Sequence, residues 1–199
     1  MLNKSVNELK LKAMKLPAIE KNILKYRSLE MMLILFHAES LKRFIIESIR
    51  ATDTLSNREN KRIPEGTKKV LQKAFKVLVN ERILTQSESD ELQALIDYRN
   101  DIAHRIYSLT CDIAHPEKPQ DHLRRLEVKY NYDALCKFEY YRAKIQKGFQ
   151  SRYVMSLSLD TLFFENAENT YKEELTRLRK RIDRQFDIRR QKIGSYRTR

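Results

Sequence analysis

Three side chains with complementary chemistry lie close together near the middle of the chain: Arg99, Asn100 and His104. A guanidinium can bind two phosphate oxygens at once and stabilise the charge that develops on them. An imidazole titrates near neutral pH and can therefore transfer a proton. Asn100 could orient His104 or donate a hydrogen bond to phosphate. This set suits cleavage of RNA by its own 2′-hydroxyl, a reaction that requires no metal in principle.

The segment around these residues has the apolar pattern of a helix with one buried face. The stripe consists of Leu92, Leu95, Ile96, Ile102, Ala103 and Ile106. Arg99 falls within the stripe, so we expect its side chain to be at least half buried, and Asn100 and His104 follow on the flank one turn apart. The alternative is structural: Arg99 pairs with Asp97 or Asp101 in a satisfied core cluster, and His104 is an isolated flank residue.

Residues 99–104, with the order Arg-Asn-Asp-Ile-Ala-His, resemble the motif of the HEPN superfamily, in which an Arg-Asn pair precedes a His. The helical segment 73–85 that runs into a turn, and residues 87–92 that open the motif helix, fit the same pattern. The resemblance is close over roughly residues 65–110 and extends to the flanking helices by pattern alone. It implies a small helical bundle, usually dimeric, and many members are metal-independent RNA endonucleases, although some are non-catalytic. In that family, two protomers bring their Arg and His side chains into one cleft.

The resemblance also suggests a mode of control. In HEPN toxins that are paired with a nucleotidyltransferase antitoxin, a Tyr two residues after the His receives the modification. Here Ile106 holds that position and Tyr107 follows one residue later. Tyr107 is therefore the candidate regulatory residue, and an antitoxin or regulatory protein is an expected class of partner.

The charge of the chain favours a polyanionic partner, RNA in the first place. The formal net charge is +13 and the pI about 9.7, which favours nucleic acid before an anionic membrane. Residues 171–199 contain eleven Lys or Arg against four Asp or Glu. The residues predicted to contact nucleic acid are Arg177, Arg179, Lys180, Arg181, Arg184, Arg189 and Arg190. Alternatively, this segment is a solvated helix whose apolar side packs on the bundle or on a second copy; the two roles are compatible.

The sequence predicts an all-α fold, a HEPN-like helical bundle with a long basic C-terminal helix. Only three Gly and four Pro interrupt the chain, which favours long helices with few loops. We expect a short helix in residues 1–17, the bundle in residues 18–158 and a basic helical extension in residues 159–199. The longest helical pattern runs from Ala18 to about Arg50. On it, His37 and Glu39 lie beside the apolar stripe, and we interpret them as a solvated flank; the alternative directs one of them at the motif helix.

The boundaries of the motif helix follow from its flanking residues. Thr85 and Glu88 have the spacing of a capping box, which predicts the start of the helix. We expect the helix to reach about Leu109 and residues 111–129 to form a loop. Within that loop, residues 112–115 repeat the tetrapeptide of residues 101–104, but Thr110 and Cys111 replace the Arg and the Asn, so we interpret the repeat as chance.

No cofactor or metal is expected. Cys111, His115 and His122 match no structural zinc spacing, and no Gly-rich phosphate loop or Ser-His-Asp pattern is present. Two cysteines favour a reducing compartment, and no signal-like apolar stretch opens the chain. We therefore expect a cytoplasmic protein with no membrane association. The predicted function is a metal-independent RNA endonuclease of HEPN type, a toxin or antiviral defence effector. The alternative is a non-catalytic nucleic-acid-binding or regulatory HEPN module that acts through its basic C-terminal helix.

Overall fold

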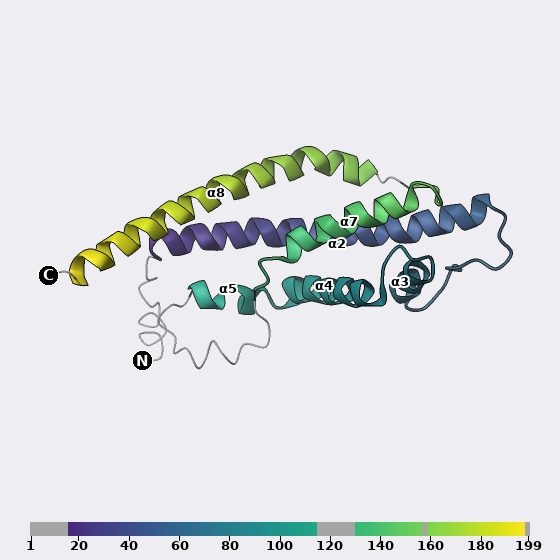
Figure 1. Ribbon diagram of the computed structural model, residues 1–199, viewed down its shortest axis with the longest axis horizontal. Helices are drawn as coiled ribbons and strands as arrows, with labels where there is room; N and C mark the ends of the chain where they lie inside the picture. Colours follow the sequence, from purple (N-terminus) through teal and green to yellow (C-terminus); the bar gives the residue numbers. More distant parts are fainter. Residues whose placement is uncertain (1–15, 115–129, 157–158, 198–199) are drawn as a thin grey trace, which may run out of the picture.

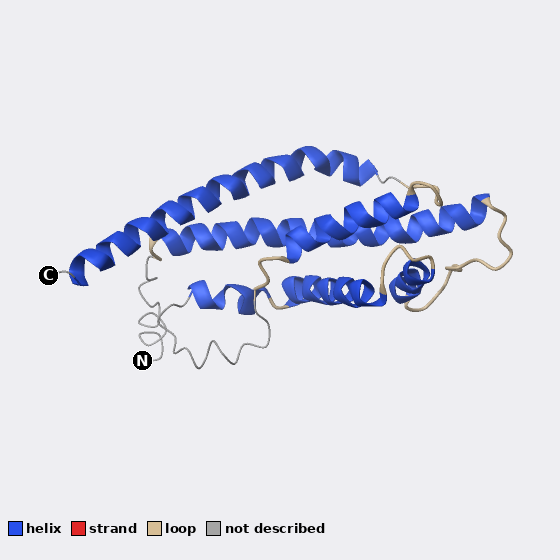
Figure 2. Cartoon of the chain, viewed as in Figure 1, coloured by secondary structure: helices blue, strands red, loops and turns tan. Residues whose placement is uncertain are grey.

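The computed structural model describes residues 16–114, 130–156 and 159–197, and all regular structure in these ranges is helical (Figure 2). The predicted all-α class is therefore confirmed. The helices are α2 (Ala18–Leu55), α3 (Val70–Asn80), α4 (Gln86–His104), α5 (Ile106–Ala114), α7 (Ala134–Phe149) and α8 (Leu159–Arg197). Most of the short helix predicted in residues 1–17, and the segment with His115 and His122, lie outside the described residues.

Helix α2 is the central element of the bundle. It contains neither Gly nor Pro over 38 residues, and Pro17 stands at its N-cap, so nothing in its sequence interrupts the backbone hydrogen bonds. The helix ends at Leu55 rather than near Arg50. Helices α3, α4, α5, α7 and α8 all pack against it. In Figure 1, α8 runs along one side of α2, and α3, α4 and α5 lie on the opposite side.

The core forms where α2, α3, α4 and α7 meet. Its fully buried large side chains include Leu33, Ile34, Ile45, Ile49, Leu78, Leu92, Phe138, Tyr141, Ile145 and Phe149. On α2, Ile34, Leu41, Ile45 and Ile49 recur at the helical spacing that places them on one face. No helix among the described residues carries an apolar stretch of the length and composition needed to cross a membrane.

Burial of α2 also encloses a charged residue. Arg27 is only 3% exposed, and its guanidinium donates to both carboxylate oxygens of Asp112 on α5, at 2.6 and 3.0 Å. It also donates to the backbone carbonyl of Leu109 at 3.0 Å and to the Tyr132 hydroxyl, and lies over the ring of Tyr130. Because an unpaired buried charge is costly, these contacts fix α5 and residues 130–132 against α2.

The motif helix begins as predicted and ends earlier. Thr85 accepts a hydrogen bond from the Glu88 backbone and Glu88 accepts one from the Thr85 backbone, so the capping box is confirmed. The helix stops at His104 rather than near Leu109, and a separate helix, α5, covers residues 106–114, where the sequence predicted a loop from residue 111. The break at Arg105 lets α5 bury Leu109 and bring Asp112 to Arg27, contacts that local helix pattern does not reveal.

Helix α8 has two different sides. Leu175, Leu178 and Ile182 are buried, and Leu175 belongs to the common core. Polar contacts continue the packing toward the end of the helix: the Asn22 amide donates to Gln185, and Arg189 pairs with Glu20. The sequence analysis placed a boundary after residue 158 and predicted a basic extension beyond it. In the structure, one side of this extension, α8, packs along α2, and its other side faces solvent.

Removal of the Arg27 partner provides a test of the packing. Asp112→Ala leaves the guanidinium buried with neutral partners only. Because Asp112 itself is partly exposed, we expect a loss of about 2 kcal/mol in the free energy of unfolding, below the range for fully buried pairs. Urea denaturation followed by circular dichroism measures the change. Glu59→Ala, in an exposed loop, is the control and should change the free energy by less than about 0.5 kcal/mol. Equal effects of the two substitutions would refute the structural importance of the pair.

Candidate functional site

Arg99 is largely buried, as its place in the apolar stripe predicted. Its side chain is 26% exposed, and Nη2 lies 2.8 Å from Oε1 of Glu39 on α2. Nη1 donates to the side-chain oxygen of Asn100 at 3.1 Å. The Nε atom is buried and has no hydrogen-bond partner within the described ranges of the chain. Asp101 instead pairs with Arg105 at 3.7 Å. The ion-pair partner of Arg99 thus lies on another helix, which differs from the cluster with Asp97 or Asp101 considered above.

The partner of Arg99 corrects the interpretation of the α2 flank. Glu39 is partly exposed, but its carboxylate contacts the motif helix instead of facing only solvent. The alternative prediction, in which either His37 or Glu39 points at the motif helix, therefore holds for Glu39. His37 is buried and contacts Glu168 on α8, on another side of α2. Residues two positions apart on an α-helix point about 200° apart around its axis, which explains why His37 and Glu39 contact different helices.

A hollow of about 410 Å³ lies where α2, α4 and the start of α3 meet, and Arg99 and Asn100 are part of its wall. Its charged lining comprises Lys42, Lys69 and Arg99 against Glu39 and Asp97. A second hollow of about 260 Å³ shares Glu39 and Lys42 and adds Arg43, Arg50 and Glu47. Four described cations besides Arg99 thus surround the ion pair, an electrostatic setting that favours an anion such as phosphate.

His104 lies apart from this hollow. It is exposed and is the last residue of α4, and it does not line the hollow with Arg99 and Asn100. Five residues turn an α-helix through about 500°, which leaves the side chains of Arg99 and His104 about 140° apart around the axis. A single α4 helix therefore does not direct both groups at one phosphate, while Asn100 and His104, one turn apart, share a face.

The end of the predicted stripe is also exposed. Ala103 and Ile106 are exposed, contrary to their assignment to the buried face, because α4 ends at His104 and α5 takes a new direction. Tyr107, the candidate regulatory residue, is exposed on α5. The C-terminal end of α4 and the start of α5 therefore present His104, Ile106 and Tyr107 to solvent as adjacent residues.

All seven basic residues predicted to contact nucleic acid are exposed on α8. Three of them form ion pairs: Arg177 with Glu173 and Glu174, Arg179 with Asp183, and Arg189 with Glu20. The other four form no ion pair with the described part of the chain; we call Lys180, Arg181, Arg184 and Arg190 the α8 cation patch. The patch and the hollow lie at different positions along α2. Arg189, beside the patch residue Arg190, pairs with Glu20 near the start of α2, whereas Glu39 and Lys42 line the hollow. Most of α8 lies away from α4 (Figure 1).

Sequence reasoning did not assign Lys42 and Lys69 to the site. Lys42 follows Glu39 by three residues on α2, and Lys69 immediately precedes α3 with a left-handed backbone, φ 58°. The only signal in the sequence was the position of Glu39 and Lys42 outside the apolar stripe. That signal identifies a flank and does not identify the helix that the flank contacts.

Comparisons of the chain with protein-family models, with curated proteins and with solved structures found no match.

Proposed function

We propose that this protein is a metal-independent RNA endonuclease of HEPN type that acts as a homodimer. The observation that carries the proposal is Arg99, which lies in a basic hollow beside Asn100 with one buried donor unpaired. An arginine in this state has donors to offer to a phosphate group, and its planar fork matches two phosphate oxygens. The RNxxxH order of residues 99–104 supplies the resemblance on which the reaction type rests.

Glu39 holds the guanidinium in the absence of RNA. An incoming phosphate replaces this carboxylate at Arg99, because the pair is partly exposed and therefore weak. Lys42 and Lys69 add positive charge around the same hollow. The hollow thus binds the scissile phosphate, and Arg99 stabilises the additional charge that appears on its oxygens during cleavage.

Proton transfer comes from His104 of a second copy. The angle of about 140° between Arg99 and His104 on one helix, and the exposure of His104, favour a cleft built from two chains. In the reaction, the 2′-oxygen forms a bond to phosphorus as its proton leaves to the second copy's His104. The bond from phosphorus to the 5′-oxygen breaks, and this oxygen takes a proton from solvent water, to which the His104 imidazolium returns its proton. The products are a 2′,3′-cyclic phosphate and a free 5′-hydroxyl.

The biological setting implied by the resemblance is a cytoplasmic toxin or antiviral defence effector. An antitoxin or regulatory protein would restrain it, and the exposed Tyr107 is a candidate for modification by such a partner. The second candidate function is a non-catalytic RNA-binding or regulatory module. The α8 cation patch favours it, since these exposed side chains lie on a helix that contributes no residue to the hollow.

Substitutions at the motif test the proposed reaction. His104→Ala should lower the cleavage rate by at least about a hundredfold through loss of proton transfer. Arg99→Ala should be similarly damaging, and Arg99→Lys should not restore the rate, because an ammonium lacks the planar fork. The assay follows a defined RNA in EDTA and identifies cyclic phosphate ends. A control RNA with a 2′-deoxy residue at the cut site should remain intact; its efficient cleavage would exclude transesterification.

Glu39 offers a test of phosphate binding that is separate from catalysis. Glu39→Gln removes a charge that competes with RNA for Arg99, so RNA affinity should rise about two- to fivefold, the equivalent of a surface ion pair. Fluorescence anisotropy with a non-cleavable 2′-deoxy-substituted RNA measures the affinity. Glu47→Gln makes the same charge change in the neighbouring hollow without a contact to Arg99. If both variants bind RNA equally well, Arg99 is not the phosphate contact.

The α8 cation patch is tested by neutralisation instead of deletion, because removal of α8 would also expose the core behind Leu175. Replacement of the four residues by Gln should reduce the slope of log K against log salt by about 2–3 on single-stranded RNA, since fewer counterions are released. The control replaces four exposed lysines on other elements, Lys61, Lys68, Lys73 and Lys76. An equal change in slope for both variants would mean that α8 provides no specific RNA contact.

A further inference from the structure

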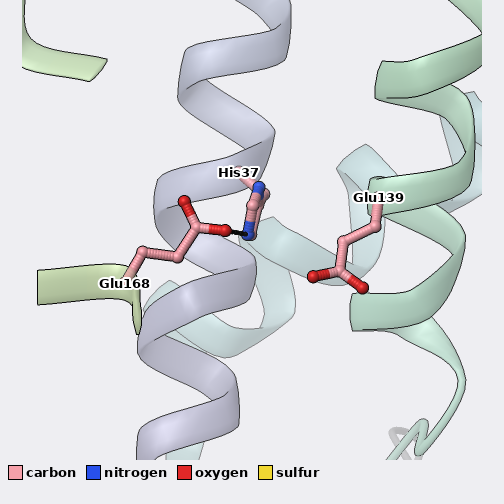
Figure 3. Close-up of side chains that lie close together, drawn as sticks. All are labelled: His37, Glu139 and Glu168. Atoms are coloured by element: carbon pink, nitrogen blue, oxygen red, sulfur yellow. Dashed lines mark ion pairs between the residues drawn. The ribbon is translucent and has the colours of Figure 1, made fainter. Parts of the chain in front are cut away.

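Three potential metal ligands from three helices meet on the side of α2 that faces α7 and α8. They are His37 on α2, Glu139 on α7 and Glu168 on α8 (Figure 3). One ligand atom from each lies within 4.8 Å of the other two. Helix α2 is far from the consecutive helices α7 and α8 in sequence, so only the fold brings His37 to the two glutamates. None of the three residues takes part in the proposed cleavage of RNA.

His37 is the unusual member of the cluster. It is 2% exposed, and its Nε2 lies 3.2 Å from a Glu168 oxygen. Despite this contact, neither ring nitrogen forms a hydrogen bond with any residue that the structure describes. A buried polar group without a partner costs about 1–3 kcal/mol. Such a group in a native fold points to an occupant that the protein chain itself does not supply, such as an ion or water.

The donor atoms suit a metal. Nε2 of His37 lies 3.2 Å from a carboxylate oxygen of Glu168, and Glu139 brings a second carboxylate to the cluster. One imidazole and two carboxylates form a donor set for divalent first-row metals such as Zn²⁺.

Lys172 forms ion pairs with both carboxylates. Its Nζ lies 2.6 Å from an oxygen of Glu139 and 2.6 Å from an oxygen of Glu168. The Lys172 side chain is 39% exposed, so its flexible stem can carry the ammonium into solvent. A divalent ion between the carboxylates would provide one more positive charge than Lys172 does and would also bind the lone pair of His37.

We propose that His37, Glu139 and Glu168 form a binding site for a divalent first-row metal ion, which enters in exchange for the Lys172 ammonium. Tetrahedral coordination with bonds of about 2.1 Å places ligand atoms about 3.4 Å apart, so ligand atoms that now lie up to 4.8 Å apart must approach by up to about 1.4 Å. Rotation of the two partly exposed glutamates provides that movement. A water molecule completes the coordination, as in zinc sites with three protein ligands. The bound ion would clamp α7 and the basic helix α8 onto α2.

The first test compares ligand substitutions in the full-length protein. After treatment with EDTA and its removal, the chain is titrated with Co²⁺, whose visible absorption reports coordination, and with Zn²⁺ in competition. Wild type should bind one equivalent, and His37→Gln and Glu139→Gln should each weaken the affinity at least about tenfold. Glu139 is partly exposed, so its variant is expected to fold even if the buried His37 variant does not. His104→Gln removes a histidine outside the cluster and should retain the affinity.

The second test concerns the exchange with Lys172. Lys172→Met removes the competing ammonium and should tighten Co²⁺ binding at least about tenfold. Lys180→Met, on the exposed side of α8, is the matched control and should leave the affinity unchanged. Zn²⁺ should also raise the Tm of wild type, by linkage of binding to folding, and should not raise that of Glu139→Gln. Failure of wild type to bind, or equal binding by wild type and Glu139→Gln, would overturn the proposal.

The proposed metal site and the proposed ribonuclease activity can be tested independently of each other. If EDTA lowers the rate of RNA cleavage because the ion that clamps the helices is removed, the Glu139→Gln substitution should lower the rate to the same extent. Cleavage by this variant should then no longer respond to EDTA. If EDTA still abolishes cleavage by Glu139→Gln, the reaction itself needs a metal, and the metal-independent mechanism is contradicted. Metal titration and thermal unfolding decide the site without reference to RNA.

Discussion

The enclosure of α2 by five other helices is the constraint on which the rest of the structure depends. A helix in this position has few solvent-facing sites, so polar residues on it must find partners on the elements around them. Arg27 meets Asp112 on α5, Asn22 meets Gln185 on α8, and the buried Asp53 meets Arg62 in the loop after α2. Each pair fixes one surrounding element against the central helix. The apolar core supplies most of the stabilising burial, and these pairs determine which element lies at which position.

The candidate site and the proposed metal site are two outcomes of this constraint. At Glu39 the side of α2 is only partly covered, so its pair with Arg99 remains accessible and an anion can compete for the guanidinium. At His37 the side is fully covered, and no residue in the described part of the chain forms a hydrogen bond with the ring nitrogens. The same helix thus presents a weak, replaceable ion pair toward α4 and an unsatisfied imidazole toward α7 and α8. The exposed ion pair at Glu39 suits transient binding of phosphate, and the buried imidazole of His37 suits a tightly bound metal ion.

The arrangement also separates the two positively charged regions. The hollow at Arg99 is lined from α2, α4 and the start of α3, whereas the α8 cation patch lies on a helix that contributes no residue to this hollow. In the dimer that we propose, the patch of one copy can serve RNA that extends beyond the cleft. Salt dependence would then report mainly on α8, whereas the rate of cleavage would depend on Arg99 and His104.

The sequence alone determined the all-α class, the start of the motif helix and the burial of Arg99. These features follow from local rules: the scarcity of Gly and Pro, the reciprocal hydrogen bonds of Thr85 and Glu88, and helical periodicity. Tertiary structure decided where α4 ends: the break at Arg105 accompanies the contact of Asp112 with the distant Arg27, which the local helix pattern does not contain. It also decided that Arg99 pairs with Glu39, and that His37 meets Glu139 and Glu168. Periodicity tells which residues share a face of a helix, but the neighbour of that face is set by packing between segments far apart in the chain.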